Sequence, residues 1–110
     1  MEFELIINRY YLYIDNDGKK CIGILRAIDY TDDVKFLSYG HECRMLNVKT
    51  MCIDYIFESD IIYMYNKEDI FIYENDKYYI VNKSYNNTDN YEELELLHLE
   101  TLKIFYIINK

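Results

Sequence analysis

The sequence predicts a small, mostly β protein of the α+β class, a twisted antiparallel sheet or barrel with one C-terminal helix. The chain has 14 tyrosines and 16 isoleucines, and both residue types favour strands. Ala27 is the only alanine and proline is absent, whereas helical proteins use alanine heavily. Turn signals such as Asp17-Gly18 and Asn75-Asp76 separate the apolar runs, as expected for hairpins.

The apolar runs give the expected elements in order. Strands are expected over residues 3–14, 19–28, 34–39, 43–57 (as two short strands), 61–65, 70–74 and 77–83. Gly23 lies inside the second of these runs and indicates a bulge or bend. Residues 84–90 are polar and rich in asparagine, which is typical of a loop.

Residues 90–103 are expected to form the helix. Asp89 can cap it, and Glu92 follows at the spacing of a capping box. Apolar side chains such as Leu94 and Leu97 recur at helical spacing, with glutamates opposite, although Leu96 and Leu99 interrupt the polar side. Residues 104–108 could continue the helix or form a last strand.

A length of 110 residues suits a single domain over 1–110. Within it, residues 58–110 are expected to form acidic hairpins and the helix, packed on residues 10–57. The net charge is −8, of which residues 1–57 carry −2 and residues 58–110 carry −6. Such a field repels nucleic-acid phosphates and attracts basic surfaces, so duplex nucleic acid is not an expected partner.

No signal peptide is expected, since residues 1–14 have no apolar run followed by a small-residue cleavage site, and no apolar run of the sequence is long enough to span a membrane. Its three cysteines are an odd number, which argues against a disulfide framework and favours the cytoplasm. Isoleucine, lysine, asparagine and tyrosine make up 49 residues, and all four have AT-rich codons. This bias fits an AT-rich genome such as that of a phage or mobile element.

Residues 10–57 resemble the first and second motifs of Sm-like proteins, and more generally SH3-like barrels. Gly18, Gly23, Leu25, Asp29 and Asp33 occupy the first motif's positions, with Asp33 where the family has asparagine. Residues 48–56 resemble the second motif, with Lys49-Thr50 in place of Arg-Gly. The resemblance implies a small barrel that binds RNA or a small ligand through Asp29, Asp33 and Lys49. The two altered positions, above all the charge of Asp33, put RNA binding in doubt.

No catalytic, cofactor or metal site is expected. Zinc sites need about four ligands, often with a close cysteine pair, and His41, Cys43, Cys52 and His98 do not provide that spacing. The serines and histidines form no recognisable nucleophile motif. Acidic pairs such as Glu92-Glu93 are expected to be solvated.

Protein binding is therefore the expected function. We expect the chain to be a non-enzymatic inhibitor that blocks a basic, nucleic-acid-binding surface of a host protein. The predicted contact residues are Tyr65, Glu68, Asp69, Tyr73, Glu74 and Asp76. The alternatives are an oligomeric barrel with a small-ligand or nucleotide pocket, and a small hydrolase without a known motif.

Overall fold

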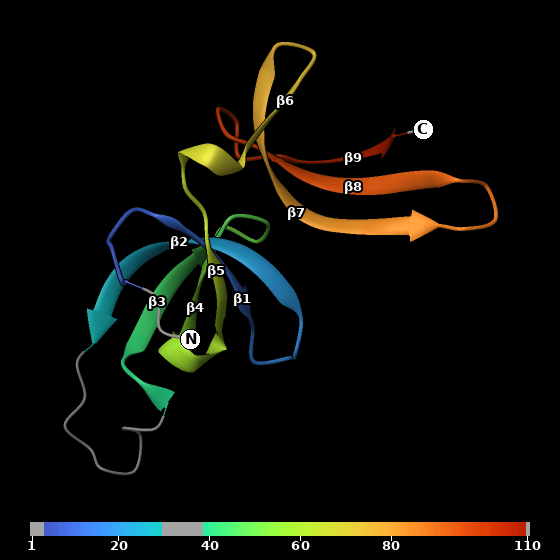
Figure 1. The fold of residues 1–110 in the computed structure, drawn as a ribbon. Helices are drawn as coiled ribbons and strands as arrows, with labels where there is room; N and C mark the ends of the chain where they lie inside the picture. The colour runs from blue at the N-terminus through green and yellow to red at the C-terminus, as the bar shows by residue number, and fades with distance from the viewer. Residues whose placement is uncertain (1–3, 30–38, 110) are drawn as a thin grey trace. The chain divides into compact units, whose positions relative to one another are not determined.

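The computed structural model describes residues 4–29 and 39–109. The chain forms two compact units, Met1–Tyr65 and Asn66–Lys110, and each contains its own antiparallel sheet (Figure 1). Strands account for 62% of the structure and helical turns for 7%. The mostly β expectation is therefore correct, whereas the expected α+β class with a C-terminal helix is wrong. The described residues contain no helix that is both long and apolar enough to cross a membrane.

The N-terminal unit is a five-stranded sheet. Its strands are β1 (Tyr10–Ile14), β2 (Lys20–Asp29), β3 (Glu42–Asn47), β4 (Cys52–Phe57) and β5 (Ile61–Met64). Their order is β4-β3-β2-β1-β5, so β1 lies between β2 and β5 (Figure 1). A short 3-10 turn, η2 (Glu58–Asp60), connects β4 to β5. The expected strand over 34–39 lies almost entirely outside the described residues.

The first hairpin forms where the Asp-Gly signal predicts it. Gly18 has a φ of +79°, a conformation that glycine adopts without strain. Asp15 Oδ1 accepts hydrogen bonds from the backbone N–H groups of Asp17 and Lys19, at 2.9 and 2.8 Å. These N–H groups lower the pKa of the Asp15 carboxyl. The turn residues thereby fix the register of β1 against β2.

The core of this unit contains a buried polar network. Tyr13 is fully buried, and its hydroxyl donates to Asp54 Oδ2 at 2.8 Å. Asn47 Nδ2 donates to the same oxygen at 3.0 Å. Burial and the Asp54 carboxylate raise the pKa of the Tyr13 phenol, which keeps it protonated. The Tyr13 ring packs against Gly23, where a Cβ would come within 2.8 Å of Tyr13 Cε1.

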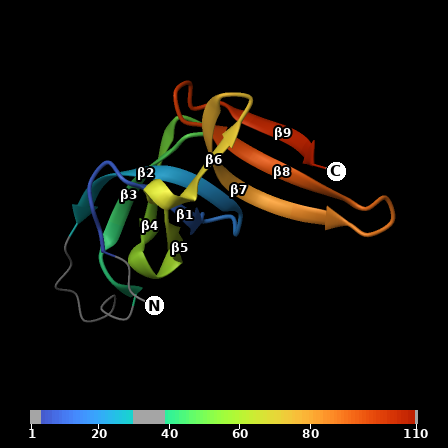
Figure 2. The same ribbon diagram turned by 45° about the horizontal axis from the view of Figure 1, so that its top comes forward.

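The C-terminal unit is a four-stranded meander. It starts with a 3-10 turn, η3 (Lys67–Asp69), followed by β6 (Ile70–Tyr73), β7 (Asp76–Asn86), β8 (Tyr91–His98) and β9 (Ile104–Asn109). Their order is β6-β7-β8-β9, so β6 and β9 are the edge strands (Figure 2). Glu74 and Asn75 both have positive φ, as a tight two-residue hairpin between β6 and β7 requires.

The segment expected to be helical is a hairpin. Residues 90–103 contain β8 and the turn into β9, and residues 104–108 form a strand. The sequence Glu93-Leu94-Glu95-Leu96 alternates with period two, and β7 and β9 pair with both edges of this strand. Leu94 and Leu96 are buried while the two glutamates lie on the other face. The helical spacing of the leucines was a weaker signal than this alternation.

Asp89 belongs to the β7–β8 turn and caps no helix. Asn86 Oδ1 accepts hydrogen bonds from the N–H groups of Thr88 and Asp89, at 2.9 and 3.1 Å. Asn90 takes a positive φ of 53° and returns the chain into β8. The expected loop over 84–90 is therefore shorter, because residues 84–86 extend β7.

Candidate functional site

A polar row crosses one face of the C-terminal sheet. Glu95 lies opposite Asn82 on β7 and opposite Tyr106 on β9. One step along the sheet, Glu93 lies opposite Ser84 on β7. Residues directly opposite in an antiparallel pair share a face, so these five side chains gather on one side of the sheet.

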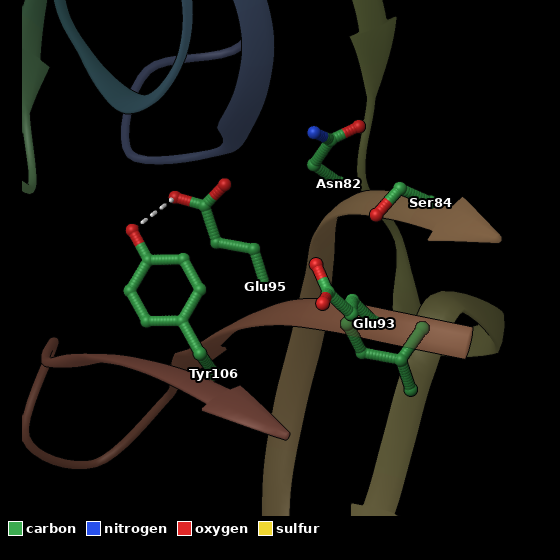
Figure 3. Close-up of a pocket in the computed structure, with 6 residues that line it drawn as sticks. Asn82, Ser84, Glu93, Glu95 and Tyr106 are labelled. Atoms are coloured by element: carbon green, nitrogen blue, oxygen red, sulfur yellow. Dashed lines mark hydrogen bonds between the residues drawn. The ribbon is translucent and has the colours of Figure 1, made fainter. Parts of the chain in front are cut away.

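These side chains surround a small depression, which we call the Glu93–Glu95 hollow. Its volume is about 110 Å³, and it is lined by Asn82, Ser84, Glu93, Leu94, Glu95 and Tyr106 (Figure 3). The Tyr106 hydroxyl donates to Glu95 Oε1 at 3.2 Å. Among the residues that the structure describes, the lining thus contains two carboxylates, an amide and two hydroxyls, and no lysine or arginine.

A β-bulge determines which β7 residues face the hollow. Up to Ile80, which lies opposite Leu96, the β7–β8 ladder is regular. The register then shifts by one residue, so that Asn82 lies opposite Glu95. Had the first register continued, Lys83 would lie opposite Glu93, because each step along β7 would match one step back along β8.

The bulge instead places Lys83 on the other face, opposite Leu94. There its Nζ lies 3.7 Å from Glu92 Oε1. Ser84 takes the position opposite Glu93. The hollow therefore contains two carboxylates, and Lys83 lies on the other face of the sheet. Such carboxylates can accept hydrogen bonds from a cationic group and form an ion pair with it.

A second polar cluster lies at the other end of the same sheet. Asp76, His98 and Glu100 place their ligand atoms within 4.8 Å of one another, beside a hollow of about 390 Å³. His98 Nε2 lies 3.5 Å from Asp76 Oδ2. Its Nδ1 accepts a hydrogen bond from Thr101 N–H at 3.1 Å and contacts Thr101 Oγ1 at 2.9 Å.

The Thr101 contact fixes the role of this histidine. A backbone N–H only donates, so Nδ1 carries no proton, and in the neutral ring the proton sits on Nε2, facing Asp76. A metal ion bound to Nε2 would require the proton to move to Nδ1, against the Thr101 N–H. His98 C=O also accepts from Leu102 N–H at 2.8 Å, so the residue closes the β8–β9 turn. The cluster fits a turn cap better than a metal ligand set.

The same imidazole forms the surroundings of the Thr101 side chain. Its hydroxyl and its backbone N–H share the one Nδ1 lone pair of His98. The imidazole is packed edge-on against Tyr78 and Phe105, with ring centroids 5.1 and 5.9 Å away. This packing holds the ring as part of the turn, which favours a structural role.

The sequence-predicted contact residues lie on both units. Tyr65 closes the N-terminal unit and is only 5% exposed. Glu68 and Asp69 lie in η3, where the Asp69 carboxylate accepts from Asn66 N–H at 2.8 Å. Tyr73, Glu74 and Asp76 lie at the β6–β7 hairpin, and Asp76 faces His98. The structure thus gathers the last three at one hairpin.

The residues implied by the Sm-like resemblance are distributed differently. Asp29 ends β2 and forms an ion pair with Arg44, with Oδ2 and Nε 2.9 Å apart. Lys49 lies in the turn between β3 and β4, and its N–H donates to Asn47 Oδ1 at 3.0 Å. Asp33 lies outside the described residues.

Sequence reasoning missed the Glu93–Glu95 hollow, because it assigned its central strand to a helix. The available signal was the strict alternation of glutamate and leucine over residues 93–96.

The charge distribution between the two structural units differs from the distribution expected between residues 1–57 and 58–110. Residues 1–65 hold eleven acids and seven bases, and residues 66–110 hold nine and five, so each unit carries −4.

No protein family, curated protein or solved structure matches this chain. The site is therefore assigned a function on its geometry and chemistry alone.

Proposed function

We propose that this chain is a non-enzymatic binding protein that takes a basic side chain of a partner protein into the Glu93–Glu95 hollow. The observation that carries the proposal is the bulge before Asn82, which turns Lys83 to the other face and gathers the carboxylates of Glu93 and Glu95 beside the Asn82 amide and the Ser84 hydroxyl. An arginine guanidinium fits such a lining because it is planar and offers several N–H donors to carboxylate and amide oxygens.

The surroundings of the hollow suit a protein partner. Tyr106 and Ile108 are 69% and 60% exposed and lie on the same face as the two glutamates. Exposed tyrosine supplies contact area with little loss of conformational entropy, and it recurs at protein interfaces. The acidic residues increase the rate of encounter with a basic surface, and the aromatic and apolar residues slow dissociation.

The negative charge of the chain favours one form of this function, the blocking of a nucleic-acid-binding surface on the partner. Such surfaces are rich in arginine and lysine, whereas this chain carries −8 and repels phosphates. The high content of amino acids with AT-rich codons fits a phage or mobile element whose protein acts in the cytoplasm of its host, which is part of the same proposal. In the alternative, a small-ligand barrel, Asp29 would have to give up its ion pair with Arg44.

Paired charge-neutral variants test the location of binding. We would measure the affinity of a fluorescent tetra-arginine peptide by anisotropy for wild type, Glu93→Gln/Glu95→Gln and Glu68→Gln/Glu74→Gln. Both variants lose the same charge, so long-range electrostatics change equally. The hollow variant should bind about tenfold more weakly than the control, as expected for losing charge-assisted hydrogen bonds. Equal weakening in both variants would contradict a specific hollow.

A further inference from the structure

The edge strand β9 has the features of a pairing surface. Residues 104–109 contain no charged side chain and no proline, and Phe105, Tyr106 and Ile108 are all exposed. β9 pairs with β8 on one side, and no described strand pairs with the other (Figure 2). Natural proteins commonly protect such edges with charges, proline or bulges. β9 carries none of the first two and pairs with β8 without a register shift.

The β8–β9 ladder fixes which backbone groups face outward. His98 N–H donates to the carbonyl of Lys103 at 2.9 Å, so these opposite residues form a hydrogen-bonded pair. Such pairs recur at every second residue of an antiparallel ladder. The N–H and C=O groups of Ile104, Tyr106 and Ile108 therefore point away from β8 and can accept another strand.

We infer that β9 pairs with β9 of a second copy of this chain, antiparallel and centred on Tyr106. In this register Tyr106 lies opposite itself across a two-fold axis, and Ile104 lies opposite Ile108 of the second copy. The outward N–H and C=O groups of all three residues then find partners. Phe105 and Ile107 lie opposite each other on the second face, so every cross-strand pair is apolar or aromatic.

The charges near the ends of β9 favour a second copy of the chain as the pairing partner. Lys103 precedes β9 and is exposed, and among the described residues it forms no ion pair. In the two-fold register it lies opposite Asn109 of the second copy, whose neighbour on β8 is Glu92. These three positions share a face, and strands two apart are separated by about 10 Å, which lysine and glutamate side chains can span together. The two-fold axis produces this Lys103–Glu92 contact twice in the dimer.

The Tyr106 side chain leaves the edge accessible. Figure 3 shows its hydroxyl turned toward Glu95 on the neighbouring strand, where it donates at 3.2 Å. The ring thus lies along the face of its own sheet. Pairing through β9 would continue the four-stranded sheet into one of eight strands, with the two hollows on either side of the axis.

Sedimentation equilibrium over a wide concentration range tests the pairing. The wild-type chain should dimerise reversibly, whereas Tyr106→Lys should weaken the dimer about tenfold or more, because a lysine would oppose a lysine at the axis. Ile72→Lys is the matched control, since Ile72 is 67% exposed on the other edge strand, β6. It should dimerise as wild type does. A wild-type chain that stays monomeric at about millimolar concentration, well above the range of stable dimers, overturns the inference.

A charge exchange makes the test independent of Tyr106. Lys103→Glu should weaken the dimer, and Lys103→Glu/Glu92→Lys/Lys83→Glu should restore it, since the cross-copy pair and the Lys83–Glu92 pair within each copy are both re-formed with reversed signs. Hydrogen exchange should show that the amides of Tyr106 and Ile108 gain protection as the protein concentration rises. Failure of the triple variant to recover dimerisation, or protection of the Ile72 amide instead, would place the interface elsewhere.

Discussion

Ser84 lies directly opposite Glu93 across the β7–β8 ladder. One residue inserted before Asn82 produces this pairing and sends Lys83 to the other face, where it lies near Glu92. A single change of register thus separates a cation from the carboxylate it would otherwise neutralise. Bulges often re-aim side chains at functional sites in this way.

A lysine introduced at position 84, opposite Glu93, should fill the hollow with a cationic side chain of the protein itself. In Ser84→Lys the new side chain lies opposite Glu93, so we expect tetra-arginine binding to be lost while stability rises by about 0.5 kcal/mol from the cross-strand pair. Peptide anisotropy and urea denaturation measure the two effects. Tyr85→Lys is the control, because it adds the same charge on the opposite face. Wild-type affinity in Ser84→Lys would argue against the hollow as the binding site.

Zinc should leave the stability of the chain unchanged. Although Asp76, His98 and Glu100 lie close together, Thr101 N–H occupies Nδ1 of His98 and leaves the proton on Nε2, the nitrogen that faces Asp76. We expect the melting temperature to be the same with zinc and with a chelator. A rise of several degrees at a stoichiometric zinc concentration would show that the Thr101 contact yields to a metal ion.

Removing the His98 ring should destabilise the C-terminal unit. His98→Ala deletes the acceptor for Thr101 N–H and the ring contacts with Tyr78 and Phe105, at a cost of about 2–4 kcal/mol. Thr101→Val keeps the N–H donor and should cost about 1 kcal/mol or less. Chemical denaturation gives both values. A small loss for His98→Ala would mean that the turn does not depend on the imidazole.

Alkaline pH should destabilise the N-terminal unit through the thiols of Cys43, which is buried, and Cys21, which is half-buried. Burial raises the pKa of Cys43 to about 12 and that of Cys21 to about 11, above the ordinary thiol value of 9.0. Their stabilising contribution is therefore present below pH 9, and it is lost as the pH rises through the folded-state values. Unfolding free energies measured at about pH 8 and pH 10.5 should differ, and less so in Cys43→Ala. An unfolding free energy that does not change with pH would contradict the raised pKa values of these two thiols.

Two glycines in the N-terminal sheet should respond differently to alanine. At Gly23 a Cβ would meet Tyr13 Cε1 at 2.8 Å and the Leu46 carbonyl oxygen at 2.9 Å, so Gly23→Ala should cost about 1–3 kcal/mol by overpacking. At Gly18 the space is open, and the cost of Gly18→Ala, about 1 kcal/mol, comes from its positive φ. Urea denaturation of both variants compares the two mechanisms, and a tolerated Gly23→Ala would show that Tyr13 can move.

Local signals in the sequence predicted much of the fold. The Asp-Gly turn after β1 forms where it was expected, because it depends on the positive φ of Gly18 and on hydrogen bonds to the Asp15 side chain. The turn expected at Asn75-Asp76 lies one residue earlier, at Glu74 and Asn75, because Asp76 already pairs with Tyr73 as the first residue of β7. The β8 strand was misassigned because leucines at positions 94 and 97 satisfy a helical period as well. Only the pairing with β7 and β9, which is not local, decides between the two.

The candidate site was beyond sequence reasoning for a similar reason. A bulge has no reliable sequence signature, and the one in β7 decides whether Lys83 or Ser84 faces Glu93. The predicted residues Tyr73, Glu74 and Asp76 do share a hairpin, because neighbours in sequence remain neighbours in a tight turn. Tyr65 is buried in the other unit, a property that its strand pattern could not reveal.

The binding of a cation in the Glu93–Glu95 hollow is tested most directly by a nuclear magnetic resonance titration. Uniformly ¹⁵N-labelled protein would be titrated with N-acetyl-arginine amide, and separately with its uncharged citrulline analogue. We predict saturable shift changes at Asn82, Ser84 and the backbone of residues 93–95 and 106 with arginine, and none with citrulline. Changes centred on residues 68–76, or equal changes with both compounds, would contradict the account.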